Sequence, residues 1–292
     1  PQEPVGKDEE AGPVGQRGGG LKRRALLAAL VAVPLAAWGA QPPAVFVVHP
    51  YDTPSRLYSR FRPLTLYLAG VLGRPMRLII ATTYDEQIEM IATGRADYAY
   101  IGPTPYVRAR ARGRVEILAG EAENGQAFYQ SALVVREDSP IRRVADLAGR
   151  RVAFGAEISM SSAVAPKLIL ARAGIRRADL AEVAHLDRHE RVALAVLHGD
   201  FDAGGLRLDI ARDYLPRGLR ILATSQPLPP HVIAASPRVP PDEAQRARQA
   251  LLHPDAGGRQ AMAALGEHTG FVAIEDAHFH AVRAMEKALE VW

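Results

Sequence analysis

The sequence predicts an α/β protein of two lobes, each built on a mixed, mainly parallel β-sheet with flanking helices. Short apolar runs of strand length alternate with segments of helical periodicity along the body of the chain. Two strand–helix–strand series can be separated, one near 44–130 and one near 150–205. The length of 292 residues matches about two domains, and 48% hydrophobic with 23% charged residues is typical of a globular protein.

The first 39 residues are expected to lie outside this fold. Residues 1–20 are rich in Gly, Pro, Glu and Gln without apolar periodicity, which predicts disorder. A cationic segment at 21–24, an apolar run at 25–37 and a small-residue site at 37–40 are the three parts of a secretory signal peptide. The run is shorter than the roughly 20 residues that span a bilayer, so we expect export and cleavage, with a retained anchor as the alternative.

Each element in the body follows from a local pattern. The run Ala44–Val48 is continuously apolar, as in a strand covered on both faces. Leu57–Leu72 has apolar residues at helical spacing, and Gly73 follows as a stop signal. The same reasoning predicts strands at 77–81, 96–101, 117–119, 131–135, 151–154, 201–204, 219–223 and 232–235. It predicts further helices at 85–93, 105–112, 141–147, 161–173, 190–198, 242–252, 258–264 and 275–291, the last three folding back on the first lobe.

Composition and motifs exclude several functions. The chain has no cysteine, which rules out disulfides, thiolate metal sites and cysteine nucleophiles. Lys and Arg number 36 against 32 Asp and Glu, and a net charge of +4 is too small to indicate a nucleic-acid partner. The motifs of nucleotide loops, zinc proteases and serine hydrolases are missing. We therefore expect no cofactor, no metal site and no catalysis.

A cluster of hydroxyl side chains opens one predicted helix. The strand at 151–154 leads into Gly155, and Ser159, Ser161 and Ser162 follow where unpaired N–H groups are expected. A helix start carries partial positive charge and free donors, which suit an anion. Serine is also a common helix cap without any ligand. One serine suffices for a cap, so an anion site and simple capping both stay open.

Five stretches carry short motifs in a characteristic order and spacing. They are Phe61–Pro75, Tyr84–Tyr106, Tyr129–Arg150, Ser159–Pro166 and His189–Gly204. The first is similar to an F-x-P-L-x-x-Y-L…L-G-x-P motif, and the fourth is the serine-rich helix start with a proline just inside it. Together they resemble the periplasmic phosphonate-, phosphite- and phosphate-binding proteins of ABC importers. The resemblance covers about 44–235, with a weaker match beyond.

The resemblance implies a two-lobed periplasmic binding protein fold, type II-like, that closes on a phosphorus oxyanion by hinge motion. Lobe I would comprise 44–132 and 224–292, and lobe II would comprise 133–223, with the hinge near 131–135 and 222–225. The implied partners are phosphate, phosphite or a phosphonate as ligand and an ABC permease in the inner membrane, with the chain as a monomer. The positions that correspond to ligand contacts are Tyr84, Tyr129, Ser159, Met160, Ser161, Ser162, His189 and Asp209.

Two positions depart from the family pattern. Met160 stands where the serine run usually has threonine, so one side-chain donor is lost. The acid that contacts an amine in the family corresponds to the segment 229–231, Pro-Pro-His, which leaves Asp209 as the expected acid of the pocket. A desolvated ammonium group needs a carboxylate. We therefore expect a small oxyanion to bind in preference to an aminoalkylphosphonate.

Other functions and simpler explanations stay open from sequence. A periplasmic sensing subunit of the same fold, feeding a signalling receptor, would share every feature above. A phosphoester hydrolase or transferase using His189 and a serine is the third hypothesis, although no nucleophile, base and orienting group form a visible set. Tyr84 and Tyr129 could be packed aromatics, and Asp209 a surface carboxylate.

Overall fold

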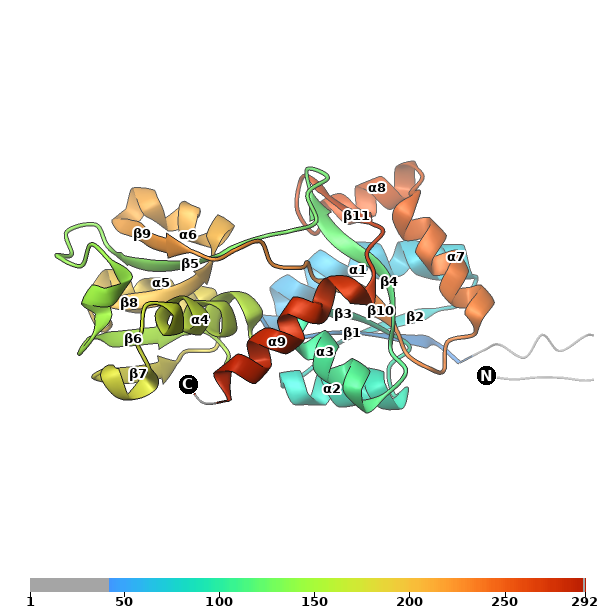
Figure 1. The fold of residues 1–292 in the computed structure, drawn as a ribbon. Coiled ribbons are helices and arrows are strands. Elements are labelled where there is room, and N and C mark those ends of the chain that lie inside the picture. The colour runs from blue at the N-terminus through green and yellow to red at the C-terminus, as the bar shows by residue number, and fades with distance from the viewer. Residues whose placement is uncertain (1–41, 291) are drawn as a thin grey trace, which may run out of the picture. The chain divides into compact units, whose positions relative to one another are not determined.

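Two β-sheets, each flanked by helices, make up the body of the protein (Figure 1). The structure is a computed structural model that describes residues 42–290 and 292. The signal segment expected at 21–40 therefore lies outside the described residues. Within the described part of the chain, no helix is both long enough and apolar enough to cross a membrane.

The first lobe contains a six-stranded sheet in the order β11-β4-β10-β3-β1-β2. Strands β1, β2 and β3 are parallel, whereas β10 runs antiparallel to β3 and β4, and β11 antiparallel to β4. Its strands are β1 (Ala44–Val48), β2 (Met76–Ile80), β3 (Tyr98–Ile101), β4 (Glu116–Glu123), β10 (Val232–Ala235) and β11 (Thr269–Val272). Its helices are α1 (Pro54–Leu72), α2 (Tyr84–Thr93), α3 (Pro103–Arg112), α7 (Pro241–Leu252), α8 (Ala256–Ala263) and α9 (His280–Leu289).

The second lobe contains a five-stranded sheet in the order β7-β6-β8-β5-β9. Strands β6, β7 and β8 are parallel, and β5 is antiparallel to both of its neighbours. The strands are β5 (Ser131–Arg136), β6 (Arg151–Phe154), β7 (Glu182–His185), β8 (Ala203–Arg207) and β9 (Leu219–Thr224), and the helices are α4 (Ala165–Arg172), α5 (His189–His198) and α6 (Leu208–Tyr214).

The core of the first lobe lies on both faces of its sheet. Every residue of β1 is buried, as the apolar run predicted. Because side chains alternate along a strand, Phe46 joins an apolar cluster with Phe61 and Leu64 of α1. Val47 joins the opposite cluster with Tyr106 of α3.

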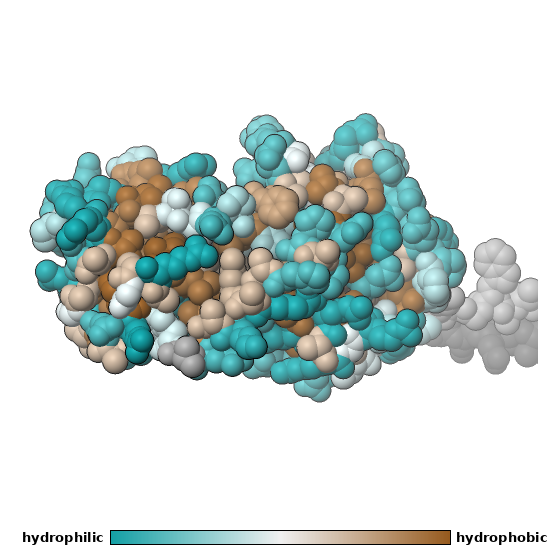
Figure 2. All heavy atoms as spheres, viewed as in Figure 1, coloured by the Kyte–Doolittle hydropathy of each residue, from teal (hydrophilic) through white to brown (hydrophobic). Residues whose placement is uncertain are grey.

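Hydrophilic side chains cover most of this lobe in the view of Figure 2, and more hydrophobic colour shows on the second lobe.

Three segments connect the lobes. The residues 124–130 join β4 to β5, and 225–231 join β9 to β10. The two ranges near which the hinge is expected, 131–135 and 222–225, lie in β5 and at the end of β9, next to these connections. Helix α9 lies across both lobes (Figure 1): it packs on α3 of the first lobe and on α4 of the second.

The end of the chain is fixed to the second lobe. The indole Nε1 of Trp292 donates to the carbonyl oxygen of Ile175 at 3.1 Å, and its ring meets Phe154 edge-on at 6.0 Å. Within α9 itself, Glu286 Oε1 forms an ion pair with Arg108 Nε of α3 at 2.8 Å.

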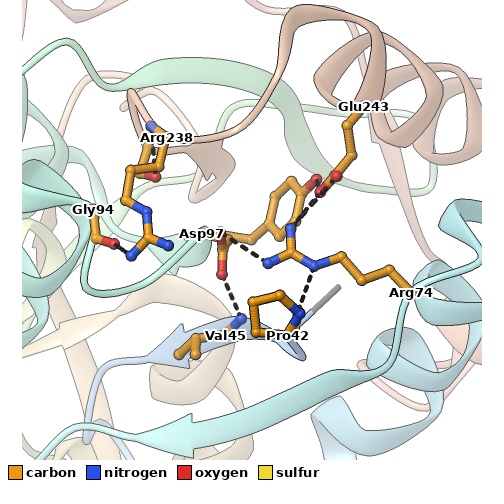
Figure 3. A network of polar contacts seen from close by, with 9 residues as sticks. Pro42, Val45, Arg74, Gly94, Asp97, Arg238 and Glu243 are labelled. Atoms are coloured by element: carbon orange, nitrogen blue, oxygen red, sulfur yellow. Dashed lines mark hydrogen bonds and ion pairs between the residues drawn. The ribbon is translucent and has the colours of Figure 1, made fainter. Parts of the chain in front are cut away.

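A buried ionic network fixes the far edge of the first lobe (Figure 3). The guanidinium of Arg74 lies between Glu243, at 3.2 Å, and Asp97, at 3.6 Å, and all three side chains are at least 90% buried. Asp97 accepts from the backbone N–H of Val45 at 2.8 Å, and Tyr98 Oη donates to Glu243 at 2.7 Å. This network therefore links the start of β1 to the segment that follows α1 and to α7.

The expected α/β fold of two mixed sheets with flanking helices is confirmed, and most differences are local. The helix expected at 141–147 is wrong, because only a 3-10 turn forms at Val144–Leu147. The carboxylate of Asp146 accepts from the N–H groups of Arg142 and Arg143, so the chain begins to coil only there. Strands β7 and β11 and helix α6 were not predicted from the sequence, and they are short segments of four to seven residues.

Candidate ligand-binding cleft

A cleft of about 980 Å³ lies between the two lobes. It is lined at the carboxyl ends of parallel strands, where ligands of open α/β sheets bind: His49 follows β1, and Arg207 ends β8. Seven of the eight residues expected to contact a ligand line this cleft, namely Tyr84, Tyr129, Ser159, Met160, Ser161, His189 and Asp209. Ser162 is buried but is not among the lining residues.

The serine-rich segment forms a tight helical start, which we call the serine turn (residues 159–164). Ser159 is its N-cap, and its Oγ accepts from the N–H of Ser162 at 3.4 Å. The following residues Met160–Val164 form a π-helical turn rather than the α-helix expected from the sequence. In an α-helix the N–H of residue 166 would donate to the carbonyl oxygen of Ser162. Residue 166 is Pro166, which lacks an N–H, so this hydrogen bond cannot form.

The carbonyl groups released in this way are bound from outside the helix. The oxygen of Ser162 accepts from the N–H of Gly155 at 3.0 Å, and the oxygen of Ser161 accepts from Ser131 Oγ at 2.6 Å. Ser131 is fully buried on β5. The serine turn is thus tied to both β5 and the end of β6, so its first N–H groups and hydroxyls are held at the wall of the cleft.

The side chain of Met160 does not replace the missing threonine donor. It is 2% exposed and belongs to the apolar cluster that also contains Val164 and Val282 of α9. A methionine here therefore contributes packing against α9, and the residue also lines the cleft.

His189 is the first residue of α5 and lines the same cleft as the serine turn. Its Nδ1 accepts from the backbone N–H of Arg207 at 3.3 Å, so in the neutral ring the proton lies on Nε2. Burial, together with the charge of Arg207, lowers the pKa of His189 to about 4. The imidazole is therefore neutral at pH 7 and offers one N–H donor.

Aromatic rings form the wall that the first lobe contributes. Tyr84, at the start of α2, lies 5.0 Å from the ring of His49, and Tyr129, between the lobes, lies 6.0 Å from the ring of His231. The rings of His49, His231 and Tyr100 are parallel to within 5°. Burial lowers the pKa of His49 to about 4, and it lowers the pKa of His231 well below its usual value.

Two charged groups of the cleft were missed from the sequence. Glu121 of β4 is a largely buried carboxylate that accepts from Tyr100 Oη at 2.8 Å. Burial raises its pKa. Arg207 lies 4.0 Å from Glu121 and 3.0 Å from Asp209. The interpretation of Asp209 as the remaining acid of the pocket is therefore wrong, since Glu121 lines the cleft as well.

Position relative to the strands could have identified two of the missed residues. His49 and Arg207 stand at the carboxyl ends of parallel strands, which is where binding side chains gather. Glu121 carries no such signal, because it lies within an antiparallel strand whose partners are distant in sequence.

Four buried polar atoms of cleft-lining residues have no hydrogen-bond partner among the described residues: Tyr129 Oη, His231 Nδ1, Arg207 Nε and Asp209 Oδ1. The last two face each other as an ion pair at 3.0 Å, which leaves Tyr129 Oη and His231 Nδ1. Buried polar groups are nearly always paired, so these atoms indicate a place for a ligand or water. Among residues 42–290 and 292, no group of three or more His, Cys, Asp or Glu side chains could hold a metal ion. The cleft is thus suited to a small polar molecule held by hydrogen bonds.

Comparison with solved structures places this fold among binding proteins. PhnD1 from Prochlorococcus marinus, in complex with methylphosphonate, has a TM-score of 0.76 at 17% identity, covering 85% of this chain and 98% of that one. A binding protein component of an ABC phosphonate transporter from Pseudomonas aeruginosa has a TM-score of 0.73 at 18% identity, covering 86% and 87%. The periplasmic aliphatic sulphonate binding protein SsuA from Escherichia coli has a TM-score of 0.56 at 17% identity, covering 85% and 86%.

These structures show that the fold is shared, and a match to a sequence family shows which family the chain belongs to. The model of the family described as "ABC transporter, phosphonate, periplasmic substrate-binding protein" matches residues 46–279. This range includes the aromatic wall, the serine turn, His189 and Arg207. The chain therefore belongs to the family of periplasmic phosphonate substrate-binding proteins of ABC transporters.

Proposed function

We propose that the protein captures a phosphorus oxyanion, either phosphate, phosphite or a small phosphonate, in the cleft and delivers it to an ABC permease. Family membership makes the chain a substrate-binding protein of a transporter and not an enzyme, as the sequence predicted. The observation that carries the choice of ligand is the serine turn, which opens into the cleft opposite an aromatic wall. A solved structure with this fold contains methylphosphonate.

The donors around the serine turn suit a tetrahedral oxyanion. Ser159 and Ser161 can each donate a hydroxyl, and the turn adds unpaired backbone N–H groups. The neutral ring of His189 adds its Nε2–H donor. Tyr129 Oη is buried without a partner among the described residues and supplies a donor from the side of the first lobe. Charge-assisted hydrogen bonds of this kind contribute about 1.5–3 kcal/mol each.

Closure of the lobes completes the site in this proposal. Donors come from both lobes, so a ligand contacts all of them only when the lobes approach. The segments 124–130 and 225–231 would absorb the motion, with the lobes divided near 132 and 224 as the sequence suggests. We further propose that the protein acts as a monomer, after removal of the signal peptide on export to the periplasm.

Isothermal titration of the purified protein with phosphate, phosphite, methylphosphonate and sulfate tests the proposal. Replacing Ser161→Ala should weaken binding of the preferred ligand about tenfold or more, since one charge-assisted bond is lost. The matched control is Ser139→Ala, which removes a buried serine of the second lobe outside the cleft and should leave affinity unchanged. Unchanged affinity in Ser161→Ala would show that the serines only cap the helix start and do not bind the ligand.

The sensing alternative uses the same ligand and the same closure. The family description names a transporter component, and no feature of the cleft favours a receptor. Transport is therefore the function we propose.

A further inference from the structure

The cleft is lined by two carboxylates, one from each lobe, with an arginine side chain of the protein between them. Glu121 comes from β4 of the first lobe, and Asp209 comes from the start of α6 in the second. Two carboxylates lining a cleft would ordinarily attract a cationic group of the ligand. The guanidinium of Arg207 lies between them, 4.0 Å from Glu121 Oε2 and 3.0 Å from Asp209 Oδ1.

Several contacts hold Arg207 at this place. Its guanidinium carbon lies 5.1 Å from the centroid of the Tyr129 ring, which is the geometry of a cation–π contact. The backbone N–H of Arg207 is bound to His189 Nδ1 at 3.3 Å. Its side chain is 22% exposed, against 17% for Glu121. Arg207 is therefore a built part of the cleft wall rather than a surface arginine that points into it.

Resting on the proposed function, we infer that Arg207 determines specificity by excluding ligands that carry an ammonium group. Both carboxylates already have the guanidinium of Arg207 as a partner, so an aminoalkyl substituent finds no unpaired acid there. It would also place its charge beside the guanidinium, and like charges in a cleft of this kind act against the wrong ligand. The cleft thus selects a phosphonate with a small, uncharged substituent, or none.

Two ligands of nearly equal size separate the effect of the ligand's ammonium charge from the effect of its size. Propylphosphonate and 2-aminoethylphosphonate differ by a terminal methyl against a terminal ammonium. In the wild-type protein, titration calorimetry should give propylphosphonate at least about tenfold tighter binding than the amine. Equal affinities, or tighter binding of the amine, would overturn the inference without any variant.

Removing the cation should release the acids for the ligand. Arg207→Met keeps an unbranched apolar stem against Tyr129, and it should shift the ratio of the two affinities toward the amine by at least about tenfold. Adding Glu121→Gln to this variant should cancel most of that shift. Arg207→Lys keeps the cation and should keep the wild-type preference.

The matched control is Arg217→Met. Arg217 lies 4.9 Å from the ring of Tyr214 in the same lobe, so its loss also removes one cation and one cation–π contact. Tyr214 lines the cleft, but Arg217 itself does not. Its affinity ratio should stay at the wild-type value. A folded Arg207→Met protein with an unchanged ratio would refute the role of Arg207 while leaving the proposed function intact. Failure of the wild type to bind phosphate, phosphite or either phosphonate would refute the proposed function and the inference together.

Discussion

The serine turn is seated on a glycine of β8, and this contact gives a sharp test of the site. A Cβ atom at Gly205 would lie 2.7 Å from Pro166 Cγ and 2.7 Å from the carbonyl oxygen of Ser162. Favourable contacts between carbon atoms lie near 3.5–4.0 Å, so Gly205→Ala forces the turn away from β8 by roughly 1 Å. Overpacking of this kind costs about 1–3 kcal/mol of folding stability.

The displacement should affect binding more than it affects folding. Hydrogen bonds weaken steeply with distance and angle, so losing even one bond to the oxyanion costs about 1.5–3 kcal/mol, or tenfold or more in affinity. Calorimetry with the preferred oxyanion measures this loss, and urea unfolding measures stability.

The neighbouring glycine supplies the control. A Cβ at Gly204 would meet Val192 at 2.6 Å and Val196 at 2.9 Å on α5, on the opposite face of the same strand. Gly204→Ala should therefore destabilise the fold to a similar extent and lose clearly less affinity than Gly205→Ala. If the folded Gly205→Ala protein binds with wild-type affinity, the serine turn does not hold the ligand.

Three further predictions concern the rest of the molecule. Arg74→Met leaves the buried carboxylates of its network unpaired and should cost about 3–5 kcal/mol in chemical unfolding, without changing ligand affinity in the folded protein. Burial lowers the pKa of His49 to about 4, so the unfolded chain binds a proton at this residue before the folded protein does, and the free energy of unfolding falls as the pH drops from about 6.5 toward 4. Between pH 7 and 5 the wild type should lose about 2 kcal/mol more of this free energy than His49→Gln. Equal pH profiles of the two proteins would contradict the burial argument. Mass spectrometry of protein exported from a bacterial host should give a chain beginning at Ala40 or Gln41, and a main species that retains the cationic segment 21–24 would contradict cleavage.

Most of the fold could be predicted because it depends on local patterns. The apolar run at 44–48 and the helical spacing at 57–72 led directly to β1 and α1. The π-helical turn could not be predicted, because it depends on which groups outside the helix bind its carbonyls. Pro166 was visible in the sequence, but Ser131 and Gly155 approach the turn only in the folded sheet.

The residues that line the cleft were predictable on the side of the second lobe and less so on the side of the first. Ser159, Ser161 and His189 stand at helix starts, which can be recognised along the chain. Glu121 reaches the cleft because β4 is threaded between β10 and β11, two strands that follow it by more than a hundred residues. Such long-range pairing leaves no trace in the neighbouring residues, so the two-acid arrangement around Arg207 needed the structure.

The residue that follows α9 near the end of the chain provides the protein with an intrinsic fluorescent probe. The chain contains two tryptophans, and one of them, Trp38, falls in the segment expected to be removed on export. The other, Trp292, is anchored on Ile175 and Phe154 of the second lobe, while Val282 of α9 is fully buried in the apolar cluster that includes Tyr106 of the first lobe. Trp292 stands three residues beyond α9, so we expect a rotation between the lobes to change the surroundings of this single indole. The fluorescence of the exported protein thus records lobe movement without any attached dye, and a spectral change on adding ligand measures closure directly.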